Sequence, residues 1–259
     1  MGRYIVKRLI YMIITLLIIT TATFYLMHSV PGDPLTARVQ KALPPQIRAN
    51  FEKKYGLDKP VTHQYLLFLK NIFTRGDFGE SITYPGIRVA DTVLKNAPVS
   101  GSIGIRALAI GLVLGTIAGM LAALKRGKWP DYLVIFIAIL GVTLPSFVLA
   151  SLLQYFFAVL LNILPAIGWG ASEKYKVIPV IALCFGTIAT YARYVRSSVL
   201  EVLNADYILT ATAKGVSHFN ILRKHVFRNA ITPSLTLLAG RIAGIFTGSF
   251  VIEKIFSIP

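Results

Sequence analysis

Long runs without a charged side chain constrain this chain more than any other feature of its sequence. The first run covers residues 9–27 and follows the basic residues Arg3, Lys7 and Arg8. A helix of about 20 apolar residues crosses a hydrocarbon core about 30 Å thick, because each residue advances the helix by about 1.5 Å. The run is longer than the apolar part of a usual signal peptide, and no A-x-A cleavage pattern follows it. We therefore predict a retained first membrane span that enters from the cytoplasm.

Four further apolar stretches predict four more spans. The five predicted spans cover residues 9–27, 97–124, 132–172, 177–195 and 230–252. The third stretch is too long for one straight crossing, but Pro145 leaves too few residues before it for a separate span. We expect one helix that is kinked or broken at "TLPSF", followed by an apolar external loop around "NILPAIGWG". With 55% hydrophobic and 15% charged residues, the expected fold class is an all-α integral-membrane helix bundle.

The distribution of basic residues predicts which loops face the cytoplasm. Basic residues outnumber acidic ones in the short loop 125–131 and in the segment 193–229, so both are predicted to lie inside with the N-terminus. Residues 31–98 are then outside, which is permitted because loops of this length translocate largely regardless of charge. The net charge of +16 does not indicate nucleic-acid binding, because many Lys and Arg flank apolar runs, where they orient helices against anionic lipid.

The same pattern divides the chain into three predicted parts. Residues 1–30 form the N-terminal cytoplasmic end and the first span, residues 31–98 a small external helical insert, and residues 99–259 a helical core with spans two to five. The insert is expected to contain three helices, because it has a Pro-to-Gly bounded segment, an amphipathic segment and a third short helical stretch. Their sequences are "LPPQIRANFEKKYG", "PVTHQYLLFLKNIF" and "RVADTVLKN".

Glycines recur every fourth residue within the second and fifth predicted spans. Each set forms a doubled G-x-x-x-G pattern, which favours close packing of membrane helices. The candidate packing residues are Gly111, Gly115, Gly119, Gly240, Gly244 and Gly248.

Arg106 and Arg241 are the charges within these two spans. A charge inside a membrane span normally faces protein or water, and either Arg could meet the carboxylate of an anionic or zwitterionic solute in a pore. The alternative is a structural role, in which the side chain reaches the interface or pairs with an acid. We favour the structural role for Arg106, which lies near the outer end of its span, and leave both roles open for Arg241.

The sequence contains no recognisable catalytic or metal-binding motif. It has no phosphate-binding G-x-x-x-x-G-K-[ST] loop, H-E-x-x-H, C-x-x-C or G-x-S-x-G. The 4 histidines are scattered, and the lone Cys184 is best explained as a small buried apolar residue. We expect a chain that is not an enzyme and binds neither metal nor cofactor, so the energy for any active process would come from another chain.

The polar segment "DYILTATAKGVSHFNILRKHVFRN" interrupts the apolar runs near the C-terminus. Helical spacing predicts one helix over 201–214, with Leu203, Tyr207, Ala211 and Lys214 on a common face. Gly215 should end it, and Ser217 should cap a second helix that reaches Arg228. The predicted apolar positions of that second helix are Phe219, Leu222, Val226 and Phe227. Two helices around a glycine corner suggest a docking element on the cytoplasmic face; the alternative is an interfacial helix on anionic lipid.

The segment "EVLNADYILTATAKGVSHFNILRKHVFRNAITP" resembles the EAA-type coupling loop of binding-protein-dependent ABC importer permeases. "TATAKG" stands in place of the E-A-A-x-x-x-G pattern, with Gly215 as its fixed glycine. Other segments, in chain order, are similar to the oligopeptide and dipeptide permease subfamily: "TFYLMHSVPGDP", "YGLDKPVTHQYLLFLKNIFTRGDFGESI", "TLPSFVLASLLQYFF" and "GSFVIEKIFSIP". The resemblance implies a type I ABC importer permease bundle with a cytoplasmic coupling loop at 196–230. It assigns contact with an ATPase to Ala211, Ala213, Lys214, Gly215, Val216, Ser217, His218 and Phe219.

The resemblance also implies the function and the partners. The chain would be a multi-pass subunit in a bacterial or archaeal cell membrane, importing peptides delivered by an external solute-binding protein. Its partners would be a second homologous permease and two cytoplasmic ATPase subunits that bind ATP and magnesium, with lipid around the spans. Members of this family continue past "FSIP" with a glycine-rich stretch and a sixth span, so we expect the sequence to be truncated.

Three alternatives to a peptide importer remain. Nickel-chelate and other small-solute importers have similar permeases, because specificity rests largely with the binding protein. A secondary transporter would show acidic or His relays and an inverted repeat, and neither is found in the predicted spans. A scaffold or receptor built around the external insert would not need the cytoplasmic loop.

Overall fold

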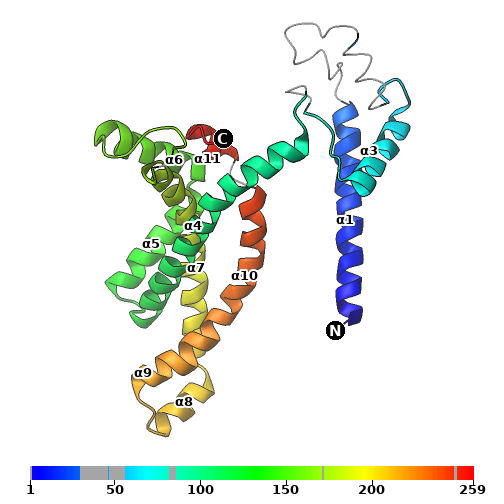
Figure 1. Cartoon of the computed structure of the whole chain (residues 1–259). Coiled ribbons are helices and arrows are strands. Elements are labelled where there is room, and N and C mark those ends of the chain that lie inside the picture. Colours follow the sequence, from blue (N-terminus) through cyan, green and yellow to red (C-terminus); the bar gives the residue numbers. More distant parts are fainter. Residues whose placement is uncertain (1, 30–45, 47–55, 82–85, 171, 248–249) are drawn as a thin grey trace. The chain divides into compact units, whose positions relative to one another are not determined.

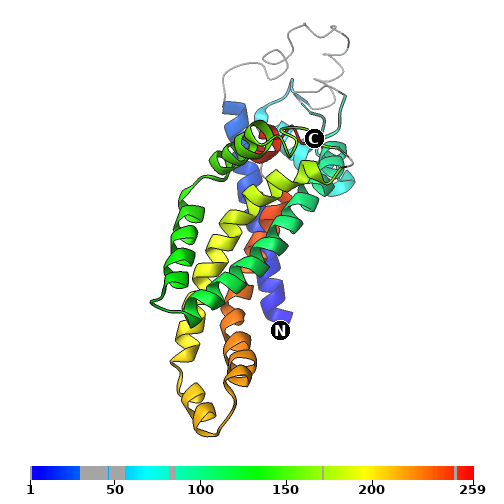
Figure 2. The same ribbon diagram turned by 90° about the vertical axis from the view of Figure 1, so that its left-hand side faces the viewer.

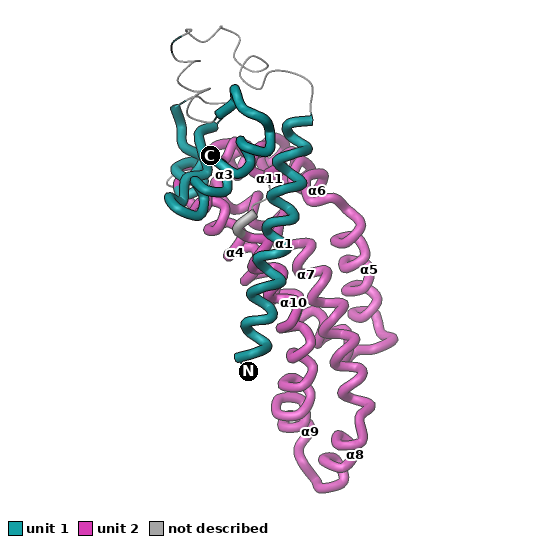
Figure 3. Tube along the Cα trace, turned by 90° about the vertical axis from the view of Figure 1, so that its right-hand side faces the viewer, with its two compact units in different colours: residues 1–94 teal, residues 95–259 magenta. Residues whose placement is uncertain are grey.

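The computed structural model describes residues 2–29, 46, 56–81, 86–170, 172–247 and 250–259 (Figure 1). Within these ranges the chain is helical, and its β structure is limited to one isolated antiparallel bridge between Glu80 and Arg88. The chain divides into two compact units, residues 1–94 and residues 95–259, coloured separately in Figure 3. The all-α fold class is confirmed.

The first unit contains α1 (Gly2–Ser29) and α3 (Val61–Arg75). No described residue of α1 is buried, as expected for an apolar helix that meets lipid on most of its surface. α3 is the predicted amphipathic helix of the insert. It ends at Gly76, whose left-handed φ of 61° lets its N–H bond back to the last turn. The first predicted insert helix, at residues 43–56, lies almost entirely outside the described residues.

The contact between α1 and α3 combines polar and aromatic side chains. The hydroxyls of Thr21 and Tyr65 lie 2.5 Å apart, and Nε2 of His28 lies 3.2 Å from Oε1 of Gln64. Phe24 stacks on His28, with ring centroids 4.1 Å apart. These contacts attach α3 to the C-terminal turns of α1.

The predicted third insert helix and the second predicted span are a single helix, α4 (Val89–Leu124). The prediction of a separate helix was wrong because Pro98 does not end α4. Proline costs about 3 kcal/mol inside a water-exposed helix, but neighbouring helices commonly compensate for it in membrane helices. With 36 residues, α4 is about 54 Å long and therefore extends beyond a hydrocarbon core.

The third predicted span is broken, as the sequence indicated. It consists of α5 (Trp129–Thr143), α6 (Ser146–Gln154) and a π-helical turn, η1 (Tyr155–Leu160). The two halves are bent by 104°. Pro145 is responsible, because it holds the preceding Leu144 in an extended conformation (φ −75°, ψ 123°) in which a helix cannot continue.

The fourth predicted span is longer than the apolar run 177–195. α7 (Lys174–Leu203) has 30 residues and retains Pro179 within its second turn. After a turn come α8 (Asp206–Ala213), α9 (His218–Asn220) and the π-helical η2 (Ile221–Phe227). The chain then continues without interruption into α10 (Arg228–Thr247), and α11 (Phe250–Ile255) is the last helix described.

Among the described residues, three helices are long and apolar enough to cross a membrane. They are α1, α4 and α7, and the bent pair formed by α5 with α6 and η1 raises the number to four if it is one span. α10, at the position of the fifth predicted span, has 20 residues, Arg228 and Arg241 among them, and is not one of these helices. The number of five spans therefore stays a prediction.

The second unit is built around α7 and has two apolar clusters. In Figures 1 and 2, α8 and α9 lie at one end of this unit, and α6 and α11 lie at the other. The cluster near α11 includes Ile103, Ile178 and Phe256, together with Cys184, which is buried as expected. The cluster near α8 joins the ends of α4 and α7 to the hairpin that follows.

Candidate functional site

Gly215 forms the corner of a helical hairpin between α8 and α9. Its φ is 75°, its N–H donates to the carbonyl of Thr212, and the N–H of Val216 donates to the carbonyl of Ala211. This pair of hydrogen bonds is the Schellman motif, which needs a left-handed residue at the corner. A Cβ at Gly215 would meet no atom within 4 Å. The backbone conformation, not lack of space, is therefore what favours glycine here.

The first arm of the hairpin begins at a different residue from the one predicted, whereas the second begins after Ser217 as predicted. The first arm starts at Asp206, because α7 continues through Leu203 before the chain turns. In the second arm Ser217 occupies the N-cap position with φ −61° and ψ 145°, but its side chain makes no capping hydrogen bond. The predicted side-chain cap was therefore wrong, although the position was right.

The π-helical turn η2 changes which residues of the second arm are buried. Ile221 and Val226 are buried against Ile208 and Ala211 of α8 and against Val199 of α7. These two residues are five positions apart, a spacing that π-helical i→i+5 bonding supports. The predicted α-helical spacing selected Val226 correctly, but it missed Ile221 and included Phe219 and Phe227, which are 69% and 41% exposed.

The outer surface of the hairpin contains most of the residues that the resemblance assigned to ATPase contact. Six of the eight are exposed: Ala213, Lys214, Gly215, Ser217, His218 and Phe219. Val216 is half-buried, and Ala211 belongs to the apolar cluster inside the hairpin, where it supports the fold of the corner.

Leu209 is a surface residue that the sequence reasoning missed. It is 73% exposed and lies one helical turn before Ala213, so both are on the same face of α8. Phe219, with the Arg223 guanidinium 6.0 Å from its ring centroid, adds an exposed aromatic side chain from the second arm. The i, i+4 spacing of Leu209 and Ala213 in the sequence could have indicated that Leu209 shares the exposed face of Ala213.

Gly111, Gly115 and Gly119 lie along the contact between α4 and α7. A Cβ at Gly111 would be 2.6 Å from Cβ of Thr187, and one at Gly119 would be 2.5 Å from the carbonyl oxygen of Ala192. Distances this short leave no room for a side chain, so these glycines allow the close approach of the two helices. Gly141 has the same role between α5 and α7, because a Cβ there would be 2.6 Å from Cβ of Ala189; it lies outside the two G-x-x-x-G patterns.

Gly240 and Gly244 do not mediate such packing. A Cβ at either position would meet no atom within 4 Å. The prediction that they are helix-packing residues is therefore wrong for these contacts, and Gly248 lies outside the described residues. Both glycines instead line a cavity of about 230 Å³ beside α10.

Arg106 forms an ion pair near the N-terminal end of α7. Its Nη1 donates to Oε2 of Glu173 at 2.8 Å, and Nζ of Lys176 donates to Oε1 of the same carboxylate at 2.6 Å. The hydrogen bond from Lys176, with a smaller contribution from Arg106, holds the pKa of Glu173 below its ordinary value. This contact supports the structural role of Arg106.

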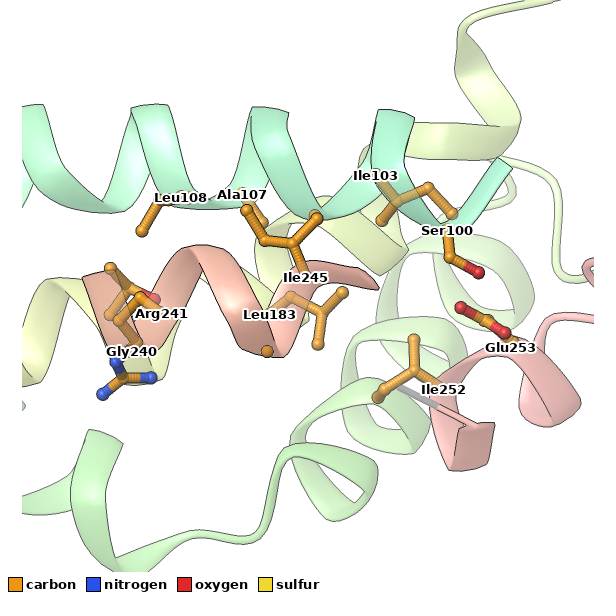
Figure 4. A pocket seen from close by; sticks show the side chains of 13 residues that line it. Ser100, Ile103, Ala107, Leu108, Leu183, Gly240, Arg241, Ile245, Ile252 and Glu253 are labelled. Atoms are coloured by element: carbon orange, nitrogen blue, oxygen red, sulfur yellow. The ribbon is translucent and has the colours of Figure 1, made fainter. Parts of the chain in front are cut away.

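Within the residues that the structure describes, no acid is paired with Arg241. Its Nη2 donates to the hydroxyl of Thr190 on α7 at 2.9 Å. It lines the cavity with Gly240 and Gly244, and the cavity extends past Leu183 and Ile245 to α11 (Figure 4). The structure thus separates the two intramembrane arginines into one that is paired and one that borders a cavity.

The described chain thus has helices apolar enough to cross a membrane and an exposed helical hairpin at one end of its second unit. The chain is a member of the binding-protein-dependent transport system inner membrane component family, which matches residues 115–259. Residues 1–103 match the N-terminal membrane component of the same systems. The assignment to the inner membrane and to an ABC permease follows from this membership.

Curated relatives match the whole chain. It is 45% identical to the dipeptide transport system permease protein DppB of Bacillus subtilis, covering 100% of this chain and 83% of the relative. The oligopeptide transport system permease protein OppB of Haemophilus influenzae is 43% identical, with coverage of 100% and 84%. OppB of Escherichia coli K12 is 41% identical, again over 100% and 84%.

Proposed function

We propose that this chain is one permease subunit of an ATP-driven importer of short peptides. The observation that carries the proposal is the match over the full chain to dipeptide and oligopeptide permeases. The solute would be delivered by an external binding protein, and a second homologous permease would complete the pathway. This chain would bind no cofactor itself, and ATP and magnesium would bind to two cytoplasmic ATPase subunits.

The α8–α9 hairpin is the proposed docking site for an ATPase subunit. Its exposed Leu209 and Phe219 offer apolar contacts, and Lys214 and Arg223 place positive charge around them. An aromatic side chain with a basic rim is typical of an energetic contact centre. The proposed partner therefore has an apolar cleft bordered by carboxylates.

Packing supports a route by which movement of the hairpin reaches the spans. Ile208 and Val226 of the hairpin are buried against Val199 of α7, so displacement of the hairpin also displaces the end of α7. α7 packs closely against α4 at Gly111 and Gly119, so movement of α7 would be passed on to α4. ATP binding can drive this movement only if the ATPases bind the hairpin differently in their two states.

Peptide uptake in cells tests the proposal. Disruption of the gene, in a strain without other peptide importers, should abolish uptake of labelled dipeptide and leave uptake of free amino acids unchanged. Loss of nickel uptake with normal peptide uptake would favour the small-solute alternative. Uptake that continues without ATP and depends on an ion gradient would favour a secondary transporter.

Copurification tests the assembly. Tagged wild-type chain should retain an ATPase subunit, whereas replacement of residues 206–220 by a Gly/Ser linker should lose it without preventing membrane insertion. Equal retention of the ATPase by both would contradict docking at the hairpin. Retention of no ATPase by the wild-type chain would argue for the scaffold alternative.

A further inference from the structure

The loop that joins α4 to α5, residues 125–128, gathers three basic side chains in a single turn. Lys125, Arg126 and Lys128 are all exposed, and Gly127 makes the turn with a φ of 71°. None of the three belongs to an ion pair in the part of the chain that the structure describes. This segment, which we name the basic loop, therefore presents positive charge that the described chain does not neutralise.

The acid beside the basic loop does not offset this charge. Asp131 is 2% exposed, and both of its oxygens accept hydrogen bonds from Arg196 of α7. The N–H of Gly127 also donates to Oδ2 of Asp131. Because Arg196 contributes a positive charge of its own, the pair that it forms with Asp131 is neutral. The basic loop is thus held in place by Asp131 and keeps its three positive charges.

Two exposed apolar stripes begin at the basic loop, one on each of the helices that it joins. Each stripe has the i, i+3 or i+4 spacing that places side chains on one face of a helix. The stripe on α5 consists of Trp129, Tyr132, Phe136 and Ile139, and the stripe on α4 consists of Leu124, Leu121, Ile117 and Leu114. α4 is long and apolar enough to cross a membrane, and α5 belongs to the bent pair that passes the same test. Both stripes therefore suit contact with hydrocarbon chains.

The position of the basic loop along the second unit corresponds to the surface of the membrane. In Figures 1 and 2 the start of α5 lies on the same side of this unit as the α8–α9 hairpin, and the hairpin extends further in that direction. Trp129, which directly follows the loop, is 73% exposed. Trp and Tyr side chains are enriched where hydrocarbon meets the lipid headgroups. The basic loop is therefore at headgroup level, between the apolar stripes and the hairpin.

We propose that the basic loop binds the headgroup of an anionic phospholipid, whose acyl chains lie along the exposed stripes of α4 and α5. Basic clusters beside membrane helices attract anionic lipids on the cytoplasmic side, the side on which the sequence predicts this loop. A zwitterionic lipid fits less well, because its ammonium group would be repelled by the three cations. A free phosphate ion would meet the cations but would leave the apolar stripes uncovered.

Trp129 provides a local probe of the lipid beside the loop. The sequence has only two tryptophans, so Trp169→Phe leaves Trp129 as the single fluorophore. This chain is reconstituted in vesicles of one fixed mixture of phosphatidylcholine and phosphatidylglycerol. In one preparation the phosphatidylglycerol has brominated acyl chains, and in the other an equal amount of the phosphatidylcholine has them. Bromine quenches tryptophan fluorescence only at short range, so brominated phosphatidylglycerol should quench Trp129 more strongly.

Neutralising the basic loop should remove this difference in quenching. The triple variant combines Lys125→Gln, Arg126→Gln and Lys128→Gln. Each basic residue near an anionic surface strengthens binding about fivefold, so the three together account for a selection of up to about a hundredfold. Exchanging the residue types, with Lys125→Arg, Arg126→Lys and Lys128→Arg, keeps the charge and should keep the difference.

A matched control removes three exposed basic residues elsewhere in the chain. It combines Lys59→Gln, Lys70→Gln and Arg75→Gln, which lie in α3 and just before it. The net charge changes by the same amount as in the triple variant of the loop, but the basic loop is intact. Trp129 should therefore still be quenched more strongly by brominated phosphatidylglycerol.

Four results would overturn the proposal. The first is equal quenching by the two brominated lipids in the unaltered loop; less ATPase copurified with the triple loop variant would then identify the loop as an ATPase contact. The second is a difference that persists in that variant. The third is a difference lost in the α3 control, which would indicate an effect of net charge alone. The fourth is a difference abolished by inorganic phosphate, which would indicate a site for a free anion. Because quenching requires neither solute nor partner subunits, these results do not depend on the proposed function.

Discussion

Arg196 of α7 donates two hydrogen bonds to Asp131 in the first turn of α5, from Nε to Oδ1 at 2.5 Å and from Nη2 to Oδ2 at 2.8 Å. Asp131 is 2% exposed, and its Oδ2 also accepts the backbone N–H of Gly127 at 3.0 Å. The carboxylate thus fixes both the loop before α5 and the position of α5 on α7. Arg196 is one turn from Val199, which packs against the hairpin, so the ion pair lies beside the proposed coupling route.

Removal of Asp131 should destabilise the protein strongly. Asp131→Ala leaves the partly buried Arg196 without its acid, and loss of one partner of such a pair costs about 3 kcal/mol. The double variant Asp131→Leu with Arg196→Met should be less harmful than Asp131→Ala, because it leaves no unpaired charge. Thermal unfolding of the purified complex measures both. Equal losses in the two variants would show that the ion pair itself contributes little.

Gly215→Val should weaken ATPase association while the chain still inserts in the membrane. A β-branched residue at φ 75° is strained, by about 1–2 kcal/mol, although no atom lies within 4 Å of its Cβ. Gly215→Asn is the matched control, because Asn adopts the left-handed conformation more readily and should retain the ATPase. Copurification and ATPase activity stimulated by loaded binding protein provide the measurements. Full association of the Val variant would contradict the importance of the corner.

A charge on the exposed face of α8 should also weaken docking. Ala213→Asp places a carboxylate on the surface proposed to contact the ATPase, where it would lose water without gaining a partner. Lys214→Ala should have a milder effect, since an exposed charge at the rim of an interface contributes little. The same copurification assay measures how much ATPase each of the two variants retains. A greater loss with Lys214→Ala would mean that charge, not apolar contact, dominates the interface.

The two sets of glycines should differ in their tolerance of a methyl group. Gly119→Ala brings a Cβ to 2.5 Å from the Ala192 carbonyl oxygen and forces α4 from α7, which typically costs about 1–3 kcal/mol. Gly240→Ala has free space and should leave the unfolding temperature unchanged or slightly higher. Unfolding of the purified complex in detergent measures the difference. Similar unfolding temperatures would indicate that α4 and α7 can adjust without loss.

Single cysteines should reveal the orientation of the loops. In a Cys184→Ala background, cysteines at Lys59 and Ser172 should react with an impermeant thiol reagent from outside, and those at Lys128 and His218 only after the cells are opened. All four positions are exposed, and Lys128 is preferable to Gly127, whose φ of 71° disfavours a side chain. Labelling of position 218 in intact cells would reverse the predicted topology.

Several elements follow from local properties of the sequence. The uncharged run 9–27 predicts α1, Pro145 predicts the break between α5 and α6, and Gly215 predicts the corner of the hairpin. Each depends on residues within a few positions along the chain: apolar length for a span, a missing N–H and a fixed φ for a break, and freedom at positive φ for a corner. Such preferences act before any distant segment is in place.

Other features depended on contacts between distant segments. Pro98 lies inside α4, although local preference alone would end the helix there. The π-helical turn buries Ile221 together with Val226 and leaves Phe219 exposed, because the turn packs against α7 and α8. Of two identical glycine patterns, the one in α4 meets α7 and the described part of the one in α10 borders a cavity.

The charged residues show the same division most clearly. The sequence by itself determined that Arg106, Arg241 and Arg196 lie in or beside apolar helices, since their positions along the chain are sufficient for that. Only the tertiary structure decided that Arg106 meets Glu173, Arg196 meets Asp131, and Arg241 borders a cavity with Glu253 beyond it. The physical reason is that the energy of a charge depends on which other charges and how much water surround it, and both are set by the packing of segments far apart in the chain.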